Sequence, residues 1–339
     1  MKKAALFLMS LAFLAGPAFS GVVKKTSSDI NFKGFGRFTT VQSQKLTAQR
    51  TWTDSQNNFK GKGLLGGLAG KAVLRSGDFS ELTDLPALSV YRIDAKKKEY
   101  TVSPIKKITE EEGGDKAEKA EEEGKPAESD IRIVKNEFKV DATGESKDIN
   151  GFPTKQFLIR WVLDWENIRT GEKGTNRLET EIWATPYSDV IRKALDEEQK
   201  YFREYMKAIG LDQDKLQQDM LGSSWLSILN GLNAAKGRPS ASADAAKAAG
   251  EMKKIQGYPV VIDGKYFATS VSPQGEAEEG SGGGKGLLGG LAKKAFKKKP
   301  AEDAAAEPSL AYRIEVQELS LVDLSDADFQ VPEGYKKKG

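Results

Sequence analysis

The sequence predicts a mainly β protein of the α+β class, in which an antiparallel sheet carries one helical insertion. Three observations lead to this prediction. Several runs alternate apolar and polar residues and are joined by short polar turns, one run has the period of an amphipathic helix, and three long connections are low in complexity. The packed sheet is therefore expected to be smaller than a 339-residue chain would allow.

The first twenty residues have the pattern of a secretory signal peptide. Two lysines precede an apolar run of about a dozen residues, and the small residues Ala18 and Ser20 form a cleavage site. The run is too short to span a bilayer, which needs about 20 apolar residues. We expect residues 1–20 to be removed, leaving 21–339 as one β-rich domain. The mature protein is expected in the periplasm or cell envelope of a bacterium, soluble or peripheral.

Strand signals begin after this segment. Aromatic and β-branched residues predict a strand over Ile30–Val41, and residues 88–102 are typical of a hairpin with a Lys-rich turn. A further strand is predicted over 131–140. The pattern resumes at 258–262 and at 311–316.

The strongest strand signal covers residues 157–165, where five apolar side chains recur with a period of two and charged residues occupy the other face. A turn at 170–174 leads to a return strand over 177–183. The apolar face is either packed core or the wall of a cavity for an apolar ligand. Its members are Phe157, Ile159, Trp161, Leu163 and Trp165.

A helical insertion is predicted over residues 188–235. Ser188 is suited to be the N-cap, Gly210 suits the C-terminal stop, and a second helix is predicted over 214–232. The first helix carries one apolar stripe, formed by Ile191, Leu195, Phe202, Tyr205, Met206 and Ile209.

Three connections lack the residues needed to pack. Residues 109–130 hold ten acidic and three lysine side chains, residues 231–250 are rich in Ala, Lys, Ser and Gly, and residues 272–308 are rich in Gly, Lys and Ala. Low hydrophobicity with many charges does not offset chain entropy, so low-complexity loops are predicted.

A glycine-leucine segment occurs twice, at residues 61–72 and 284–295, with eleven of twelve positions identical. Tyr91-Arg-Ile-Asp94 and Tyr312-Arg-Ile-Glu315 follow at separations of 30 and 28 residues. Internal duplication or convergence on one loop chemistry explains the pattern. The segment matches GxGxxG, but polar residues precede it where a dinucleotide site needs a buried strand.

The second copy continues into a basic stretch that ends at Lys299. If residues 284–299 are helical, an apolar face lies beside lysines, as in segments that contact anionic membranes. The alternative is a flexible insert whose leucines cover an edge of the sheet. The candidate membrane-contact residues are Leu287, Leu288, Leu291, Phe296, Lys297 and Lys298.

Composition narrows the chemistry. The chain has no cysteine and no histidine, which excludes disulfides, thiolate chemistry and the Ser-His-Asp and Cys-His nucleophiles. Glu179 and Glu181 share one strand face, but such faces are common on surfaces. Residues 323–328 lack the glycine and closing glutamate of a calcium loop. We therefore expect no catalytic residues, no metal and no cofactor.

Charge gives no general attraction to nucleic acid. Without Lys2 and Lys3, 50 basic side chains balance 49 acidic ones. The expected partners are a lipid or other apolar ligand and an anionic membrane surface.

The order of several motifs resembles that of an uncharacterised family of exported bacterial proteins. The motifs are Tyr91–Val102, Ile149–Phe157 leading to Glu181–Thr185, Ile255–Val261, and Phe329–Lys336. The resemblance implies a fold similar to the periplasmic lipoprotein carriers: a curved antiparallel sheet that forms an incomplete barrel, with helices in its concavity. It also implies an apolar cavity for acyl chains. The long inserts depart from the family pattern.

Together these features lead to two expectations. The first is an envelope protein that binds a lipid or other apolar ligand on the concave face of a curved sheet. The alternative is a structural or peripheral membrane-surface protein that acts through the inserts at 61–72 and 284–299.

Overall fold

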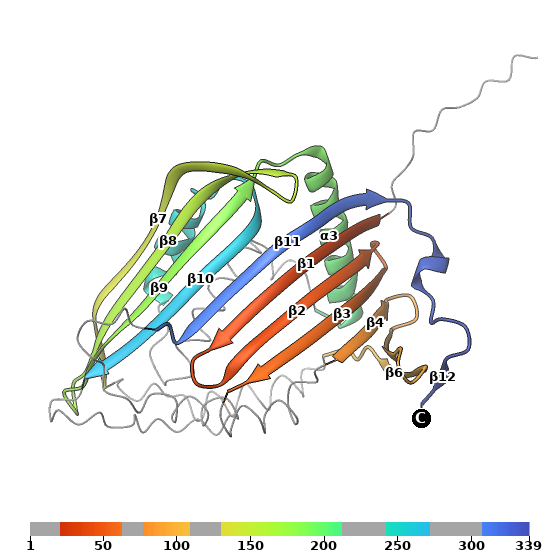
Figure 1. The fold of residues 1–339 in the computed structure, drawn as a ribbon, viewed down its shortest axis with the longest axis horizontal. Helices are drawn as coiled ribbons and strands as arrows, with labels where there is room; N and C mark the ends of the chain where they lie inside the picture. The colour runs from red at the N-terminus through yellow and green to blue at the C-terminus, as the bar shows by residue number, and fades with distance from the viewer. Residues whose placement is uncertain (1–20, 63–76, 109–129, 212–241, 272–306, 339) are drawn as a thin grey trace, which may run out of the picture.

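The computed structural model describes residues 21–62, 77–108, 130–211, 242–271 and 307–338, which form one sheet and two α-helices (Figure 1). The sheet has twelve strands in the order β12-β6-β5-β4-β3-β2-β1-β11-β10-β9-β8-β7. The strands are β1 (Gly21–Phe32), β2 (Gly36–Leu46), β3 (Arg50–Gly61), β4 (Gly77–Asp84), β5 (Ser89–Asp94), β6 (Glu99–Pro104), β7 (Ile131–Ile149), β8 (Phe152–Asn167), β9 (Lys173–Thr185), β10 (Tyr258–Val271), β11 (Leu310–Val322) and β12 (Lys336–Lys337).

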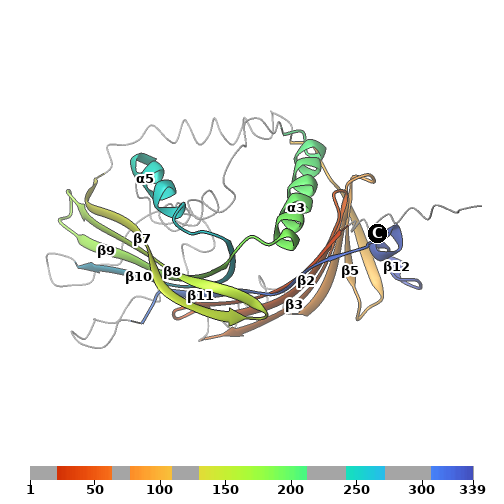
Figure 2. The same cartoon turned by 90° about the horizontal axis from the view of Figure 1, so that it is seen from above.

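The sheet is curved and open. Neighbouring strands pair antiparallel except at the short parallel contact between β12 and β6. The strand order starts at β12 and ends at β7, so the sheet does not close into a barrel. Both helices, α3 (Asp189–Ala208) and α5 (Ser242–Met252), lie on its concave side (Figure 2). The predicted class, a mainly β protein with a curved antiparallel sheet, is confirmed.

The strand predicted over Ile30–Val41 is wrong in detail. The chain reverses at Lys33–Phe35, where Gly34 has a φ of 76°, and the run is divided between β1 and β2. Aromatic residues on both sides of a tight turn had the appearance of one strand. The hairpin predicted over 88–102 is confirmed as β5 and β6.

Helix α3 begins and ends as predicted. The Ser188 hydroxyl accepts a hydrogen bond from the Ile191 N–H at 3.3 Å, and Gly210 follows the helix with a φ of 79°. Ile191 and Met206 are buried, but Phe202 of the predicted stripe is 43% exposed. The predicted second helix at 214–232 lies outside the described residues, as do the predicted signal peptide at 1–20 and most of the predicted loops at 109–130 and 272–308.

One part of the predicted loop at 231–250 is wrong, because α5 occupies Ser242–Met252. Its sequence is rich in alanine, the residue with the highest helix propensity, and carries little apolar periodicity. Composition alone therefore made this helix look like a loop.

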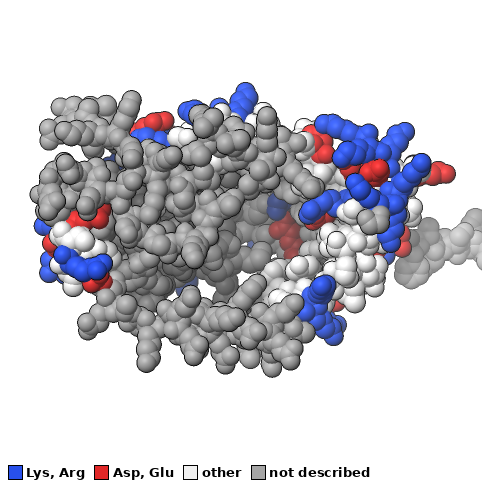
Figure 3. All heavy atoms as spheres, turned by 90° about the horizontal axis from the view of Figure 1, so that it is seen from below, with Lys and Arg blue, Asp and Glu red and all other residues white. Residues whose placement is uncertain are grey.

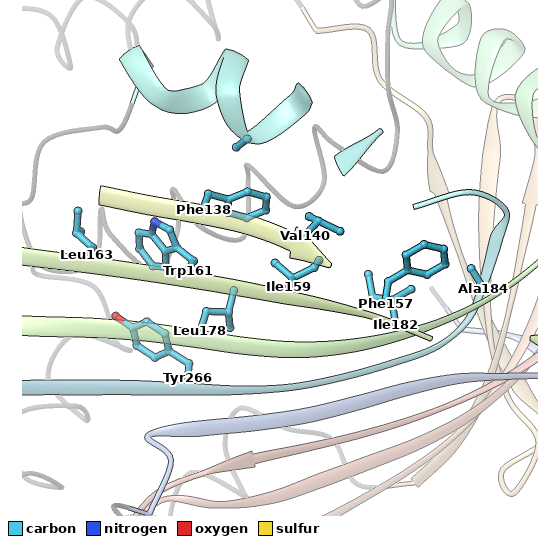
Figure 4. Close-up of a cluster of buried hydrophobic side chains, with 11 residues drawn as sticks. Phe138, Val140, Phe157, Ile159, Trp161, Leu163, Leu178, Ile182, Ala184 and Tyr266 are labelled. Atoms are coloured by element: carbon cyan, nitrogen blue, oxygen red, sulfur yellow. The ribbon is translucent and has the colours of Figure 1, made fainter. Parts of the chain in front are cut away.

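Two groups of buried residues form the core. The β8 cluster joins β7 to β10 with α5, and its members are Phe138, Val140, Phe157, Ile159, Trp161, Leu163, Leu178, Ile182, Ala184, Ala248 and Tyr266 (Figure 4). The α3 cluster centres on the helix and the middle of the sheet, and its members are Val22, Leu46, Trp183, Ile191, Ala194, Tyr258, Val260, Val261, Val316 and Leu319.

The tip of the β7–β8 hairpin reaches a strand that is not its neighbour. The Asn150 side-chain amide donates hydrogen bonds to Glu315 Oε1 at 2.8 Å and to the Val316 carbonyl at 3.0 Å, both on β11. The Lys147 ammonium lies 3.7 Å from the centroid of the Trp183 ring. The tip therefore packs across β10 on the convex face, opposite the helices.

Candidate functional site

The five residues predicted to share one face of the strongest strand do so. Phe157, Ile159, Trp161, Leu163 and Trp165 are at most 5% exposed. The first four lie on the concave side of β8 (Figure 4), and the period of two places Trp165 on the same side. Trp161 is held by a hydrogen bond from its indole N–H to Asn136 Oδ1 at 2.8 Å. Both alternatives for this face, core and ligand-cavity wall, predict burial, so burial does not distinguish between them.

Register extends this face across the neighbouring strands. Directly paired residues of an antiparallel sheet point to the same side. Ile159 pairs with Thr180, Trp161 with Leu178 and Leu163 with Asn176. On the next strand, Leu178 pairs with Tyr266 and Ile182 with Ile262. We call the concave side of β8, β9 and β10 the apolar face.

Two glycines make room for aromatic rings on the apolar face. A Cβ at Gly264 would collide with the Tyr312 ring, and a Cβ at Gly174 would collide with the Trp165 indole. The Tyr312 hydroxyl lies 3.1 Å from Thr180 Oγ1. Burial raises the pKa of Tyr312 to about 12, so this hydroxyl remains neutral at physiological pH.

Helix α5 lies over the apolar face and is held lightly. Ala248 is its buried side chain in the β8 cluster, and Met252 packs against the cluster. Glu251 Oε2 accepts a hydrogen bond from the Val140 N–H of edge strand β7 at 2.9 Å. Hydrogen bonds from Lys254 and from that N–H lower the pKa of Glu251. An alanine-rich helix covers the face with little apolar surface of its own.

Beyond the residues that pack against α3, the concave side of β1, β2 and β3 carries polar side chains. Register places Ser28, Thr40 and Asn57 on this side, and the Thr40 hydroxyl is 2.7 Å from Asn57 Oδ1. In the view from below, acidic and basic side chains are visible near the middle of the molecule (Figure 3). The concave side thus combines an apolar half with a polar half.

A buried ion pair joins α3 to the sheet within the polar half. Lys24 Nζ lies 2.6 Å from Glu198 Oε1, and the Tyr258 hydroxyl is close to both. Burial lowers the pKa of Lys24, but Tyr258 and Glu198 outweigh this effect, and the pKa is raised. A charged Lys24 therefore fixes the helix beside the apolar face.

The predicted membrane-contact residues Leu287, Leu288, Leu291, Phe296, Lys297 and Lys298 lie outside the described residues. The structure does describe where the first glycine-leucine segment leaves the sheet and where the connection that holds the second segment returns to it. The Lys62 N–H donates to the Phe35 carbonyl at 2.8 Å, and the Lys33 N–H donates to the Ser309 carbonyl at 3.1 Å. The β1–β2 turn therefore holds the base of each connection, on adjacent parts of one rim (Figure 1).

That rim carries aromatic and basic side chains. The Phe35 ring centroid lies 6.3 Å from that of Phe32 and 5.4 Å from that of Phe59. Phe32 is 40% exposed. We define the aromatic rim as Phe32, Lys33, Phe35, Phe59, Lys60 and Lys62.

The structure places the two motifs that follow the copies on different strands. Tyr91 lies on β5, with β4 described between the first copy and this strand, whereas Tyr312 lies on β11, the first strand described after the second copy.

Other candidate chemistry is explained by ordinary pairing. Asp326 accepts a hydrogen bond from Arg50 at 2.6 Å, and Asp328 accepts one from Lys45 at 3.3 Å. Glu179 pairs with Arg177 at 3.2 Å. Within the described part of the chain, no cluster of acidic residues has the arrangement of a metal site. The same part contains no helix with the length and hydrophobicity of a membrane span.

Asn176, which is 1% exposed on the apolar face, was not among the residues predicted for this site. The predicted return strand began at Arg177, four residues after the start of β9 at Lys173, and so left Asn176 out. Extending the period of two from Ile182 and Leu178 by one more step identifies Asn176 as the next residue on the same face.

Comparison of the chain with protein-family models, with curated proteins and with solved structures finds no match. Functional inference therefore depends on the geometry of the concave side.

Proposed function

We propose that this is an envelope protein that binds a lipid or another amphiphilic molecule on the concave side of its sheet. The observation that carries the proposal is the apolar face itself: among the described residues, large aromatic and aliphatic side chains of one open sheet layer are covered by α5 rather than by a second sheet. A core built only for stability is usually sealed by an element with a complementary apolar surface.

Two further features support the proposal. Helix α5 has eleven residues, and isolated helices shorter than about 12–15 residues are marginal in water. It is therefore suited to move aside when a ligand enters. The adjoining polar half is suited to a headgroup, so an amphiphile fits the concave side better than a wholly apolar molecule does.

Native mass spectrometry of the purified protein, followed by lipid extraction, tests whether a ligand is retained. Quenching of tryptophan fluorescence by a brominated acyl chain then locates the bound ligand. Trp161 and Trp165 lie on the apolar face, whereas register places Trp52 on the convex side. We expect quenching in the wild type and in Trp52→Phe, and loss of most quenching in the double variant Trp161→Phe/Trp165→Phe. Unchanged quenching in the double variant would place the ligand elsewhere.

The aromatic rim favours a second candidate function, contact with an anionic membrane surface. Phenyl rings beside lysines are typical of interfacial anchors, and each lysine near such a surface contributes about 1 kcal/mol. The first glycine-leucine segment leaves the sheet at this rim, and the connection that holds the second segment returns to the sheet beside it at Ser309.

Vesicle sedimentation tests this second function. We expect deletion of residues 284–299 to reduce binding to phosphatidylglycerol vesicles, and Lys60→Glu/Lys62→Glu to weaken it by roughly 25-fold or more. Neutral phosphatidylcholine vesicles and the variant Lys193→Glu, on the exposed side of α3, serve as controls. Equal binding by all proteins would refute membrane contact through the rim.

A further inference from the structure

Asn176 is a buried residue of the apolar face whose carboxamide the described fold leaves unused. It is 1% exposed, it pairs in register with Leu163 on β8 and Ala268 on β10, and neither Nδ2 nor Oδ1 has a hydrogen-bond partner. Two buried threonines nearby do have partners. Thr180 contacts the Tyr312 hydroxyl at 3.1 Å, and Thr154 donates to the Lys147 carbonyl at 2.8 Å.

A buried carboxamide without partners destabilises the fold, because it loses its hydrogen bonds to water and gains none. Leu178 and Ile182, on the same face of the same strand, show that the site accepts aliphatic side chains. Packing therefore gives no reason for asparagine at 176. A bound molecule that supplies the missing partners does give a reason.

The chemistry of the missing partner follows from the carboxamide. Asn176 offers an N–H₂ donor and a carbonyl acceptor, so a complementary ligand group needs one acceptor and one donor. An ester or ether satisfies only the donor. A carboxylate is charged, and no charged side chain belongs to the β8 cluster to balance it. A primary amide, whose N–H and carbonyl lie on one edge, satisfies both positions without a charge.

Neighbouring residues place this group at one end of the apolar face. Trp165 pairs with Gly174 and Tyr266 pairs with Leu178, so they flank Asn176 along β9. Tyr266 lies on the α5 side of the sheet with Trp161 and Leu178 (Figure 4). An acyl chain along these side chains brings a polar group at its end to Asn176.

We propose that Asn176 recognises the primary amide of an acyl-amide ligand, by donating to its carbonyl and accepting from its N–H. This inference rests on the proposed function and specifies its ligand class. Among amphiphiles that share one acyl chain, the apolar face is expected to prefer the one that carries an amide.

Binding of two neutral probes, dodecanamide and methyl dodecanoate, tests the inference by titration calorimetry. The probes share one acyl chain, and only the amide has an N–H. We expect the wild type to bind the amide about tenfold more tightly than the ester. This difference corresponds to one additional buried hydrogen bond, in which Asn176 Oδ1 is no longer left without a donor. Asn176→Leu is expected to bind both probes with affinities within about twofold and to melt no lower than the wild type.

Thr180→Val is the matched control, since Thr180 is a buried polar residue of the same strand whose partner is within the protein. It is expected to melt lower and to keep the amide preference. Equal affinities of the wild type for both probes, or an amide preference retained by Asn176→Leu, would overturn the role of Asn176 while leaving the proposed function standing. Failure of the wild type to bind either probe would contradict the proposed function itself.

Discussion

Single side chains illustrate how this protein places polar groups against an apolar interior. Tyr201, Tyr258 and Tyr312 all have a raised pKa, chiefly because burial disfavours the phenolate. Each hydroxyl has nearby polar partners: Thr51 and Thr83 for Tyr201, Lys24 for Tyr258 and Thr180 for Tyr312. The neutral phenols thus join strands and helix without a buried negative charge.

The raised pKa values predict loss of stability in alkali. An unfolded tyrosine loses its proton near pH 10.0, whereas folded Tyr312 keeps it to about pH 12. Above pH 10 the unfolded chain therefore binds fewer protons, and the free energy of unfolding falls as pH rises. For Tyr312 alone the expected loss by pH 12 is about 2 kcal/mol. Urea unfolding at pH values from about 8 to about 12 measures it.

Tyr312→Phe removes this contribution and is expected to flatten the pH dependence above pH 10, although it also loses the contact with Thr180. Replacing exposed Tyr187 with Phe is the control and is expected to leave the slope as in the wild type. If the free energy of unfolding of Tyr312→Phe fell with pH as steeply as that of the wild type, the alkaline loss of stability could not be assigned to Tyr312.

The two helices differ in how firmly the sheet holds them. Helix α3 has twenty residues, an N-cap, buried Ile191 and Met206, and the Lys24–Glu198 ion pair. Helix α5 has eleven residues, and Glu251 joins it to the backbone of β7. We expect α5 to open far more readily than α3, because local opening follows the number of buried contacts that break.

Two neighbouring substitutions in α5 test this difference in opposite directions. Gly250 has open space at its Cβ position, so Gly250→Ala is expected to stabilise the helix by about 0.5–1 kcal/mol and to slow uptake of an acyl probe. Glu251→Gln weakens the contact with the Val140 N–H and is expected to speed uptake. Stopped-flow tryptophan fluorescence measures both rates. Equal rates in the two variants would show that α5 does not control entry.

Elements with a strong local signal could be predicted from the sequence. The N-cap Ser188, the stop at Gly210 and the alternation over 157–165 identify α3 and β8 directly, because capping and side-chain period are local properties. Strands β3 and β4 escaped prediction because they are largely polar, and their place in the sheet depends on pairing with strands elsewhere in the chain. Asn176 was missed for a related reason, since its burial arises from neighbours on β8 and β10.

Across the entire sheet, the β7–β8 hairpin ties distant strands together. Its bulges between Ile133 and Lys135 and between Ala142 and Ser146 allow β7 to bend, and its tip reaches β11 through Asn150. The curvature of the C-terminal half of the sheet is therefore fixed by contacts at the hairpin tip as well as by the backbone hydrogen bonds between neighbouring strands. Loss of the tip contact is expected to loosen the concave side as a unit.

Two substitutions separate the contributions of Asn150. Its φ of 54° lies in the left-handed region, which Gly adopts freely and Ala does not. We expect Asn150→Gly to lose about 1–2 kcal/mol through the two hydrogen bonds, and Asn150→Ala to lose about 1 kcal/mol more through backbone strain. Urea unfolding measures both values. Equal stability of Asn150→Gly and wild type would show that the tip contact contributes nothing.

The central ladder between β1 and β11 joins residues from opposite ends of the chain, with Gly21 opposite Val322 and Phe32 opposite Leu310. Pairing across such a sequence separation has a large loop-closure entropy and is slow. During synthesis the first strand has one neighbour, β2, and stays without the other until residues 310–322 have left the ribosome. The two halves of the sheet are therefore joined last, and a chain still being made keeps its concave side unassembled.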